Sequence, residues 1–519
     1  MTRMQHGARI GALTFLAAIL LGWLTAGTAI FFDDGLRYIG QAQGLARGSI
    51  GDGLLHAVDH PMYPAAIALA HRAVGGESPK AWQVAAQSAS MLIGMMLVMP
   101  LYLVALELFG ERAAWLGVLL ALLAPLTGHV LADVLSEGTF LVFWMWGLYA
   151  ALRFLRDGRF LWLPPTIVCA GLAYLSRPEG LLLPAALVAT LLALPFLRST
   201  RMNWPRWWAA IAFLVIGPLC IAGPYIAAKG GIGTKPAVRR LLGTEAKSAP
   251  DAVERARPLD PNQSAARTYF EAAKAVVGAV REATTTPLLL LSTYGLFVAI
   301  RRSWSSRGRS WLLLAIIGAA AGLALIRLHA TGGYCSARHA MVLSLPLILA
   351  AGAGLESLLT SLPIPSTWLG LGPEEQFAAG PIVWVVALGG FIAWYAAPLR
   401  EPVNFAKAGY KGAGEWIAKE VPPGAKVADV TGLSLYYAGH PGYTFANLIE
   451  APGDPDLRWV VVRENHLKGP WTYCKKLSAL VDGATLRMTF PPDPKPGQAK
   501  VFIYERPARI AAAADRTKG

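Results

Sequence analysis

The sequence predicts an α-helical polytopic membrane protein that ends in a small α/β domain, and three observations support this fold class. Of the 519 residues, 55% are hydrophobic and only 15% are charged, whereas soluble domains carry about one quarter charged residues. The apolar residues gather in runs long enough for helices that cross a hydrocarbon core, which takes about 20 residues each. After Pro398 the pattern changes to a helical stretch and short apolar runs typical of strands.

The distribution of charge argues against one class of function. The formal net charge is +15, but the basic residues are spread over short loops rather than gathered on one face or in one domain. Lysines and arginines in such loops set membrane topology and meet anionic lipid phosphates. We therefore expect membrane lipids as partners and no nucleic acid.

Hydropathy, with breaks at charged clusters, predicts about eleven membrane spans. The first span follows Arg3 and Arg9 as a secretory signal would, but it is long for a signal and no A-x-A-like cleavage site follows it, so we expect it to be retained. The predicted spans are Ile10–Ile30, Val84–Leu106, Ala113–Val130, Thr139–Phe154, Leu161–Leu175, Leu181–Leu197, Trp207–Ala227, Thr286–Ile300, Trp311–Leu328, Met341–Leu359 and Ile382–Ala397.

Orientation follows from the arginines of the short loops, which stay in the cytoplasm. A cytoplasmic N-terminus places the clusters at 153–159, 198–206 and 301–309 all on the cytoplasmic side. The loop 228–285 is also basic but would lie outside, and it is long enough for the rule to weaken. An odd number of spans then puts the C-terminal domain in the periplasm of a bacterium, with the chain in the inner membrane.

These patterns divide the chain into a membrane domain, residues 1–398, and a soluble α/β periplasmic domain, residues 399–519. The membrane domain carries a first outside loop at 31–82. We interpret the joining segment with Pro398 and Pro402 as a linker. In the soluble domain we expect a helix at Ala408–Glu420 and strands at Lys426–Val430, Trp459–Val462 and Val501–Tyr504.

Two adjacent carboxylates, Asp33 and Asp34, stand where the first span ends. Full ionisation beside lipid is costly unless a partner or water relieves it, so such a pair indicates a functional site. The alternative is an interfacial anchor or a helix cap, with Asp34 preceding the helical run Leu36–Leu45. Position alone leaves both interpretations open.

Further polar groups fall in predicted outside segments. Asp133 and Glu137 are one helical turn apart and would share a face, although Glu137 also suits a helix N-terminus. Arg177 and Glu179 form either a structural ion pair or part of a cavity. His56, Asp59 and His60 look like metal ligands, but no second ligand set accompanies them, which favours loop structure or sugar hydrogen bonding.

The order of these motifs resembles the lipid-linked-sugar glycosyltransferases of the C-type superfamily. Members include bacterial relatives of protein O-mannosyltransferases and of the aminoarabinose transferase that modifies lipid A. The resemblance rests on the acidic pair followed by Tyr38, His-Pro-x-Tyr-Pro at His60–Pro64, DVLSEGTF at Asp133–Phe140, LAYLSRPEGLLLP at Leu172–Pro184 and SARHAMVLSLPLILAAGAGL at Ser336–Leu355.

The resemblance implies a membrane glycosyltransferase, a hexosyl or pentosyl transferase with a polyprenyl-phosphate sugar as donor. The acceptor would be a periplasmic lipid, glycan or protein, and the anomeric centre would invert. The family's base is an Asp in the first outside loop, in the pattern Asp, Glu, two residues, Tyr. Spacing to Tyr38 matches Asp34, with Gly35 in place of Glu, and leaves Asp33 as a rival or helper.

The resemblance also implies substrate-binding residues. Arg338 resembles the arginine on the donor's phosphate side, with His339 where the family often has Tyr; its alternative role is to reach lipid head groups. The loop Lys229–Arg281 is a candidate gate over the donor. Some family members bind a divalent metal, so a metal cofactor stays open, without assigned ligands. The expected substrate-binding residues are Tyr38, His60, Asp133, Glu137, Arg177, Arg338 and His339.

Two other functional classes compete with this interpretation. A multi-span transporter or lipid flippase would use outward carboxylates for protons or cations, and would carry charged residues deep within its spans. Most ionisable residues here stand at loop edges instead, which favours the enzyme. A noncatalytic scaffold that presents the C-terminal domain would tolerate neutral residues at Asp33 and Asp34.

Overall fold

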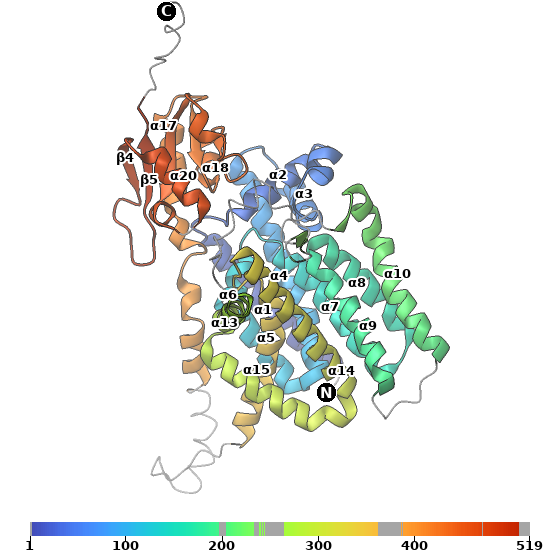
Figure 1. Ribbon diagram of the computed structural model, residues 1–519. Helices are drawn as coiled ribbons and strands as arrows, with labels where there is room; N and C mark the ends of the chain where they lie inside the picture. The colour runs from blue at the N-terminus through green and yellow to red at the C-terminus, as the bar shows by residue number, and fades with distance from the viewer. Residues whose placement is uncertain are drawn as a thin grey trace, which may run out of the picture.

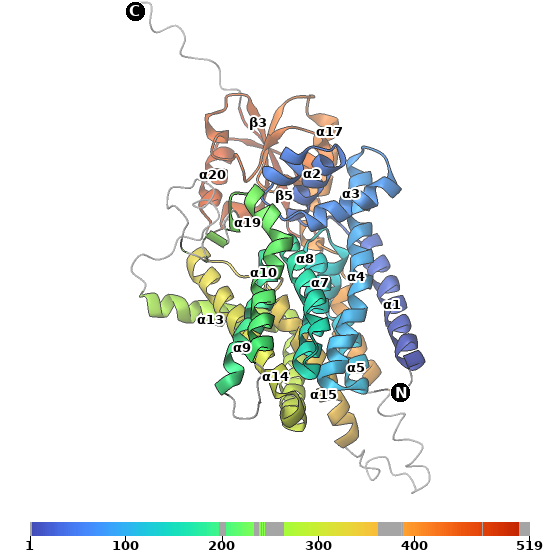
Figure 2. The same cartoon turned by 90° about the vertical axis from the view of Figure 1, so that its right-hand side faces the viewer.

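The computed structural model describes residues 3–196, 204–232, 238–239, 241, 243, 264–361, 386, 388–469 and 471–507. Over these residues a helical bundle carries a small sheet region, residues 409–505, on one end (Figures 1 and 2). We call this the sheet end of the bundle and the opposite one the far end. The first helix begins at the far end (Figure 1).

The bundle consists of long apolar helices, as the composition predicts. Within the described residues seven helices are long and apolar enough to cross a membrane, or eight when α5 and α6, bent by 64°, count as one broken span. The helices of the bundle are α1 (Arg3–Ala26), α4 (Pro79–Phe109), α5 (Glu111–Leu123), α6 (Pro125–Ala132), α7 (Glu137–Asp157), α8 (Leu163–Ser176), α9 (Leu182–Ala193), α10 (Trp204–Ala228), α13 (Ala265–Thr284), α14 (Thr286–Gly332) and α15 (Met341–Ser361).

The predicted polytopic helical fold is confirmed, and the difference from eleven spans has physical causes. The fifth predicted span is an apolar helix, Phe160–Ser176, that is shorter than a membrane crossing requires. The eighth and ninth join into the 47-residue α14, which has one non-helical residue at Arg307 where the two predicted spans meet. The eleventh, Ile382–Ala397, lies partly outside the described residues.

Between α1 and α4 the chain forms short helices at the sheet end. They are α2 (Asp34–Ala46), the π-type turn η1 (Gly51–Leu55) and α3 (Met62–Val74), and α2 contains the predicted run Leu36–Leu45. Tyr38, Ile39 and Ala42 fall on one face of α2 and are buried, as residues three and four apart on a helix are.

The sheet region has five strands in the order β2-β1-β3-β5-β4. β1 runs parallel to β2 and β3, whereas β5 runs antiparallel to β3 and β4. The elements are α17 (Gly409–Glu420), β1 (Lys426–Asp429), α18 (Leu433–Ala438), β2 (Gly442–Tyr443), β3 (Leu457–Arg463), α19 (Glu464–Leu467), α20 (Thr472–Val481), β4 (Thr485–Phe490) and β5 (Val501–Glu505).

The predicted helix and the three predicted strands of this region are confirmed. Two strands were not predicted from the sequence: β2 has only two residues, and most side chains of β4 are exposed and form no apolar run. Residues 508–519, the end of the predicted soluble domain, lie outside the described residues.

The sheet region and the first outside segment share one hydrophobic core. Phe31 and Tyr38 from the loop after α1 and from α2 belong to the same buried cluster as Tyr410, Ile417 and Val461 of the sheet region. Figure 1 shows α2 and α3 beside the sheet region. Burial of apolar area drives such packing, so the contact holds the sheet region to the bundle.

The segment that joins bundle and sheet region is packed and is not a free linker. Leu399 and Val403 are only 3% and 1% exposed and belong to the core of the bundle. The backbone N–H of Ala29 donates a hydrogen bond to the Val403 carbonyl, 3.2 Å away. The prolines at 398 and 402 thus mark turns in a packed segment.

The shared core predicts that bundle and sheet region unfold together. Ile417 is fully buried in it, and Ile417→Ala should cost about 2–5 kcal/mol. Thermal denaturation of the purified chain in detergent should show one transition at a lower temperature. The matched control is Leu486→Ala, at a 49% exposed position of β4, which should change stability by about 0.5 kcal/mol or less. Two separate transitions would contradict the shared core.

Candidate functional site

Charged side chains from distant parts of the chain meet at the sheet end. Asp34, the first residue of α2, accepts a hydrogen bond from Arg338, with 3.0 Å between Oδ2 and Nη2. Its other oxygen, Oδ1, lies 3.1 Å from Nη1 of Arg37, one turn further along α2. Arg37 also pairs with Asp59, 2.8 Å away. The Asp34 carboxylate therefore lies between two guanidinium groups.

Glu137 extends this network on the other side of Arg338. It opens α7 and is 3% exposed. Its Oε1 lies 2.9 Å from Arg177 and 3.6 Å from Arg338. Arg177 also pairs with Glu179 at 2.9 Å. The second oxygen of Glu137 is buried without a hydrogen-bond partner among the described residues, so it is a strong acceptor that the described residues leave unused.

Asp33 has a partner of its own, Lys407 from the segment before α17. Asp33 occupies the cap position of α2, but its side chain makes no capping hydrogen bond. The ammonium group of Lys407 lies 3.6 Å from the centre of the Phe32 ring, and the guanidinium carbon of Arg338 lies 4.2 Å from the same centre. Each aspartate of the acidic pair thus forms an ion pair with a cation, and neither side chain caps the helix.

Asp133 fixes the backbone around the acidic pair. It follows α6 and is 3% exposed. Its Oδ1 accepts the N–H groups of Phe32 and Val134, at 3.0 and 2.7 Å, and its Oδ2 accepts the side-chain amide of Asn404 at 2.8 Å. That amide also donates to the Ile30 carbonyl at 2.9 Å. Asp133 and Asn404 therefore clamp together the loop after α1, the α6–α7 break and the entry to the sheet region.

The charges around Asp34 set its protonation. Burial by itself would raise the pKa of Asp34, but Arg37 and Arg338 outweigh burial and hold that pKa well below its usual range. Conversely, burial opposes the charge of Arg338, yet Glu137 and Asp34 raise its pKa above the usual range. In the free site, Asp34 is a carboxylate held by cations.

His339 is neutral at physiological pH. Burial lowers the pKa of His339 to about 4, and the charges of Arg177 and Arg338 act in the same direction. The backbone N–H of Ser336 donates to its Nδ1 at 3.2 Å, so the proton of the neutral ring is on Nε2. His339 lies next to Arg338 in the turn before α15 and contacts Tyr334 edge to face, with ring centres 5.7 Å apart.

Two other predicted residues border the network. The Tyr38 hydroxyl lies 2.9 Å from the Ser136 hydroxyl, next to Glu137, and the ring meets Tyr63 edge to face. His60 is 6% exposed, and its ring centre lies 5.1 and 5.5 Å from those of Tyr174 and Tyr225. The described residues contain no group of three His, Cys, Asp or Glu side chains that could hold a metal ion.

The roles of four residues of this network were not predicted from the sequence. Arg37 carries a readable signal, because a cation three residues after Asp34 on a helix is a standard ion-pair spacing. Asp59 stood out only for its resemblance to a metal ligand, whereas it pairs with Arg37. Lys407 and Asn404 carry no local pattern, since their partners lie far away in the sequence.

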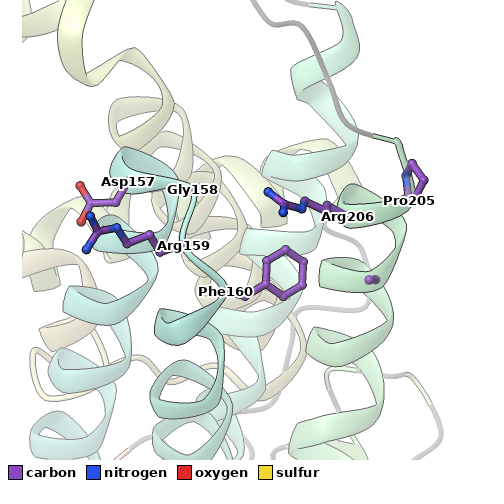
Figure 3. A pocket seen from close by; sticks show the side chains of 7 residues that line it. Asp157, Gly158, Arg159, Phe160, Pro205 and Arg206 are labelled. Atoms are coloured by element: carbon purple, nitrogen blue, oxygen red, sulfur yellow. The ribbon is translucent and has the colours of Figure 1, made fainter.

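A separate hollow opens at the far end of the bundle. It lies at the other end of α7 from Glu137, so it takes no part in this network. Asp157 on its edge is already paired with Arg153 and Arg156, at 2.8 and 3.2 Å. The residues that line it are Asp157, Gly158, Arg159, Phe160, Pro205, Arg206 and Ala209 (Figure 3).

The clamp at Asn404 predicts a graded effect of two substitutions. Asn404 has a positive φ of 55°, which asparagine tolerates better than alanine and glycine adopts freely. Asn404→Gly loses only the amide, whereas Asn404→Ala also strains the backbone and should be less stable than Asn404→Gly by about 1 kcal/mol. Thermal midpoints in detergent measure the order, and equal midpoints would contradict it.

Comparisons with known proteins agree with this architecture. Residues 59–221 match the family model described as dolichyl-phosphate-mannose-protein mannosyltransferase. That segment includes His60, Asp133, Glu137 and Arg177 but neither Asp34 nor Arg338. A search of curated proteins finds no significant match.

Solved structures match over nearly the whole chain. The apo oligosaccharyltransferase of Archaeoglobus fulgidus has a TM-score of 0.58 at 12% identity, over 88% of this chain and 70% of that one. The A. fulgidus oligosaccharyltransferase AglB, in complex with an inhibitory peptide and a dolichol-phosphate, has 0.59 at 11%, over 99% and 76%. ArnT from Cupriavidus metallidurans bound to undecaprenyl phosphate has 0.55 at 15%, over 97% and 98%. The chain thus shares the fold of the A. fulgidus oligosaccharyltransferase and of ArnT, in agreement with the resemblance seen in the sequence.

Proposed function

We propose that this chain transfers a sugar from a polyprenyl-phosphate donor to an acceptor hydroxyl at the sheet end of the bundle. The observation that carries the proposal is the pair of Asp34 and Arg338, which are 304 positions apart in sequence. The fold thus brings a candidate base and a candidate phosphate ligand to one place. The similar ArnT and AglB structures hold undecaprenyl phosphate and a dolichol-phosphate, which supports this class of donor.

The reaction we propose is a single displacement at the anomeric carbon. The acceptor oxygen attacks that carbon while its proton passes to Asp34. The bond between the anomeric carbon and the phosphate oxygen breaks, and its electron pair leaves with the polyprenyl phosphate. Arg338 suits the leaving phosphate because a guanidinium stays charged and can donate two parallel hydrogen bonds. The anomeric centre inverts.

The same geometry couples donor binding to the base. As long as Arg338 donates to Asp34, the carboxylate is a weak proton acceptor, because its pKa is held low. A donor phosphate that takes hydrogen bonds from Arg338 removes one of the two guanidinium partners of Asp34. Its pKa then rises toward the usual range, and Asp34 becomes a stronger base once the donor is in place.

The neighbouring residues take supporting roles in this proposal. Glu137, which has one oxygen without a partner among the described residues, accepts a hydrogen bond from a sugar hydroxyl, and Arg177 holds Glu137 in place. Tyr38 and Asp133 position α2 and the acidic pair, while His60 and His339 border the donor. The candidate gate, 229–281, includes most of the helix α13 and is therefore not a loop throughout, while its residues 233–237, 240, 242 and 244–263 lie outside the described residues.

The carboxylates of this site do not fit a resident divalent metal. Asp34 faces two arginines and Asp133 is filled by three hydrogen bonds, whereas Mg²⁺ and Ca²⁺ need several free oxygen ligands at once. The proposed reaction therefore routes no step through a metal ion.

We infer the orientation in the membrane from the arginines of the short loops. We place the far end in the cytoplasm and the sheet end in the periplasm of a bacterial inner membrane, as the positive-inside rule indicates. The acceptor is then a periplasmic lipid, glycan or protein.

The transfer reaction gives a direct test. With radiolabelled polyprenyl-phosphate sugars in proteoliposomes, Asp34→Asn should lower the transfer rate by about 10²–10⁴-fold, because an amide cannot accept the proton. Asp33→Asn should change it less than Asp34→Asn does. The matched control is Asp52→Asn, at an exposed aspartate of the same outside segment, which should leave the rate unchanged.

Other outcomes would redirect the assignment. Equal losses in Asp33→Asn and Asp34→Asn would remove Asp34 as the single base. No transfer from any donor, together with lipid or solute flux that needs no acceptor, would favour a transporter.

The pH dependence of the reaction tests the coupling of Asp34 to Arg338. The carboxylate is the active form, and its pKa in the free protein is depressed, so wild-type kcat/KM should lack an acid limb from Asp34 in the range where this residue normally titrates. Arg338→Met should raise that pKa and bring the acid limb to higher pH, whereas Arg338→Lys should leave it low. Identical pH profiles of kcat/KM for wild type and Arg338→Met would contradict the coupling of Asp34 to Arg338.

A further inference from the structure

Lys407 reaches into the candidate site from the start of the sheet region. Its side chain is 18% exposed and pairs with Asp33, which is 25% exposed. Its ammonium group lies 3.6 Å from the centre of the Phe32 ring, and Arg338 approaches the same ring centre to 4.2 Å. Because both cations contact one ring, their charges lie close to each other at the site.

We propose that Lys407 is a further binding residue of this site, which together with Arg338 holds the polyprenyl phosphate that leaves the sugar. The inference rests on the function proposed above and extends it to the sheet region. In the free protein Asp33 holds the ammonium group of Lys407, and the phosphate takes the place of that carboxylate.

The charge of the leaving group favours a second cation in the site. A polyprenyl-phosphate sugar is a phosphodiester with one negative charge. When its bond to the anomeric carbon breaks, the electron pair stays on the phosphate oxygen, and the polyprenyl phosphate carries two negative charges. Arg338 balances the first charge, and Lys407 balances the second as it develops. A cation aimed at developing charge lowers the barrier more than it tightens donor binding.

The backbone around Lys407 holds this cation in place. The Lys407 N–H donates to the Asn404 carbonyl at 2.8 Å, and the Asn404 side chain is bound to Asp133 and to the Ile30 carbonyl. The clamp that positions the acidic pair therefore also positions Lys407. A side chain on such a support reaches a ligand with little loss of conformational freedom.

A purely structural role accounts poorly for this ion pair. Partly exposed salt bridges contribute about 1 kcal/mol or less to stability, and the sheet region is already held by the core around Tyr410 and Ile417. Lys407 also acts on the candidate base, since its charge helps to lower the pKa of Asp34. Its position thus matters more for charge in the site than for attachment of the sheet region.

Ligand binding tests the inference without turnover. The full chain in lipid nanodiscs would be titrated with undecaprenyl phosphate at pH 5 and pH 8, since the second pKa of a phosphomonoester is about 6. Lys407→Met should weaken binding at pH 8 by about 10- to 100-fold, the size of a lost charge-assisted hydrogen bond, and by much less at pH 5. Affinity for an undecaprenyl-phosphate sugar, a single anion, should change little.

Three further variants control this measurement. Lys407→Arg should retain binding because it keeps the charge. Asp33→Asn, which releases Lys407, should tighten binding of undecaprenyl phosphate at pH 8. Lys411→Met removes a lysine at an exposed position of α17 and should leave both affinities unchanged. Thermal midpoints of all variants establish that the proteins compared are folded.

The outcomes separate the inference from the function. Unchanged affinity of Lys407→Met at pH 8, while the wild type binds, would overturn the role of Lys407 and leave the transferase proposal standing. An equal loss at both pH values would also overturn it, because the second charge would then play no part. A wild type that binds no undecaprenyl phosphate would remove both proposals.

Discussion

Charge pairing at the sheet end of the bundle is the constraint on which the rest of the structure depends. An isolated ion in a low-dielectric environment costs several kcal/mol, so buried charges need partners in defined places. Asp34, Arg338 and Glu137 come from α2, from the turn before α15 and from the start of α7. Each ion pair therefore fixes one helix end relative to another. The apolar helices of the bundle only need to be long enough to bring these ends to the charge network.

The sheet region is part of this arrangement. Its core is continuous with the loop after α1, the segment that leads to it is buried in the bundle, and Asn404 and Lys407 from that segment bind Asp133 and Asp33. A loosely attached domain could not hold side chains at hydrogen-bonding distance from the bundle. The packing of aromatic and aliphatic residues thus has a functional consequence, because it keeps these two side chains in the site.

Much of this could be predicted from the sequence, wherever the signal is local. Apolar runs predicted most helices of the bundle and three of the five strands, but α13 lies in the segment 228–285 that was predicted to be a loop. Contacts between distant segments were out of reach: no pattern around Lys407 indicates that its partner is Asp33, 374 positions away. The segment with Pro398 and Pro402 was interpreted as a linker because proline indicates a turn, but a turn can be buried, as Leu399 is.

The two adjacent aspartates pair with different cations, and a bound donor phosphate would take one cation from each. In the proposed reaction the phosphate draws Arg338 away from Asp34 and Lys407 away from Asp33. Asp34 keeps Arg37, which is anchored by Asp59, so it stays oriented while its pKa rises. The structure gives Asp33 no second cation among the described residues, and it is then free to turn toward water. A general base must stay oriented toward the acceptor hydroxyl while its pKa rises. This requirement favours Asp34 over Asp33 for the proton transfer.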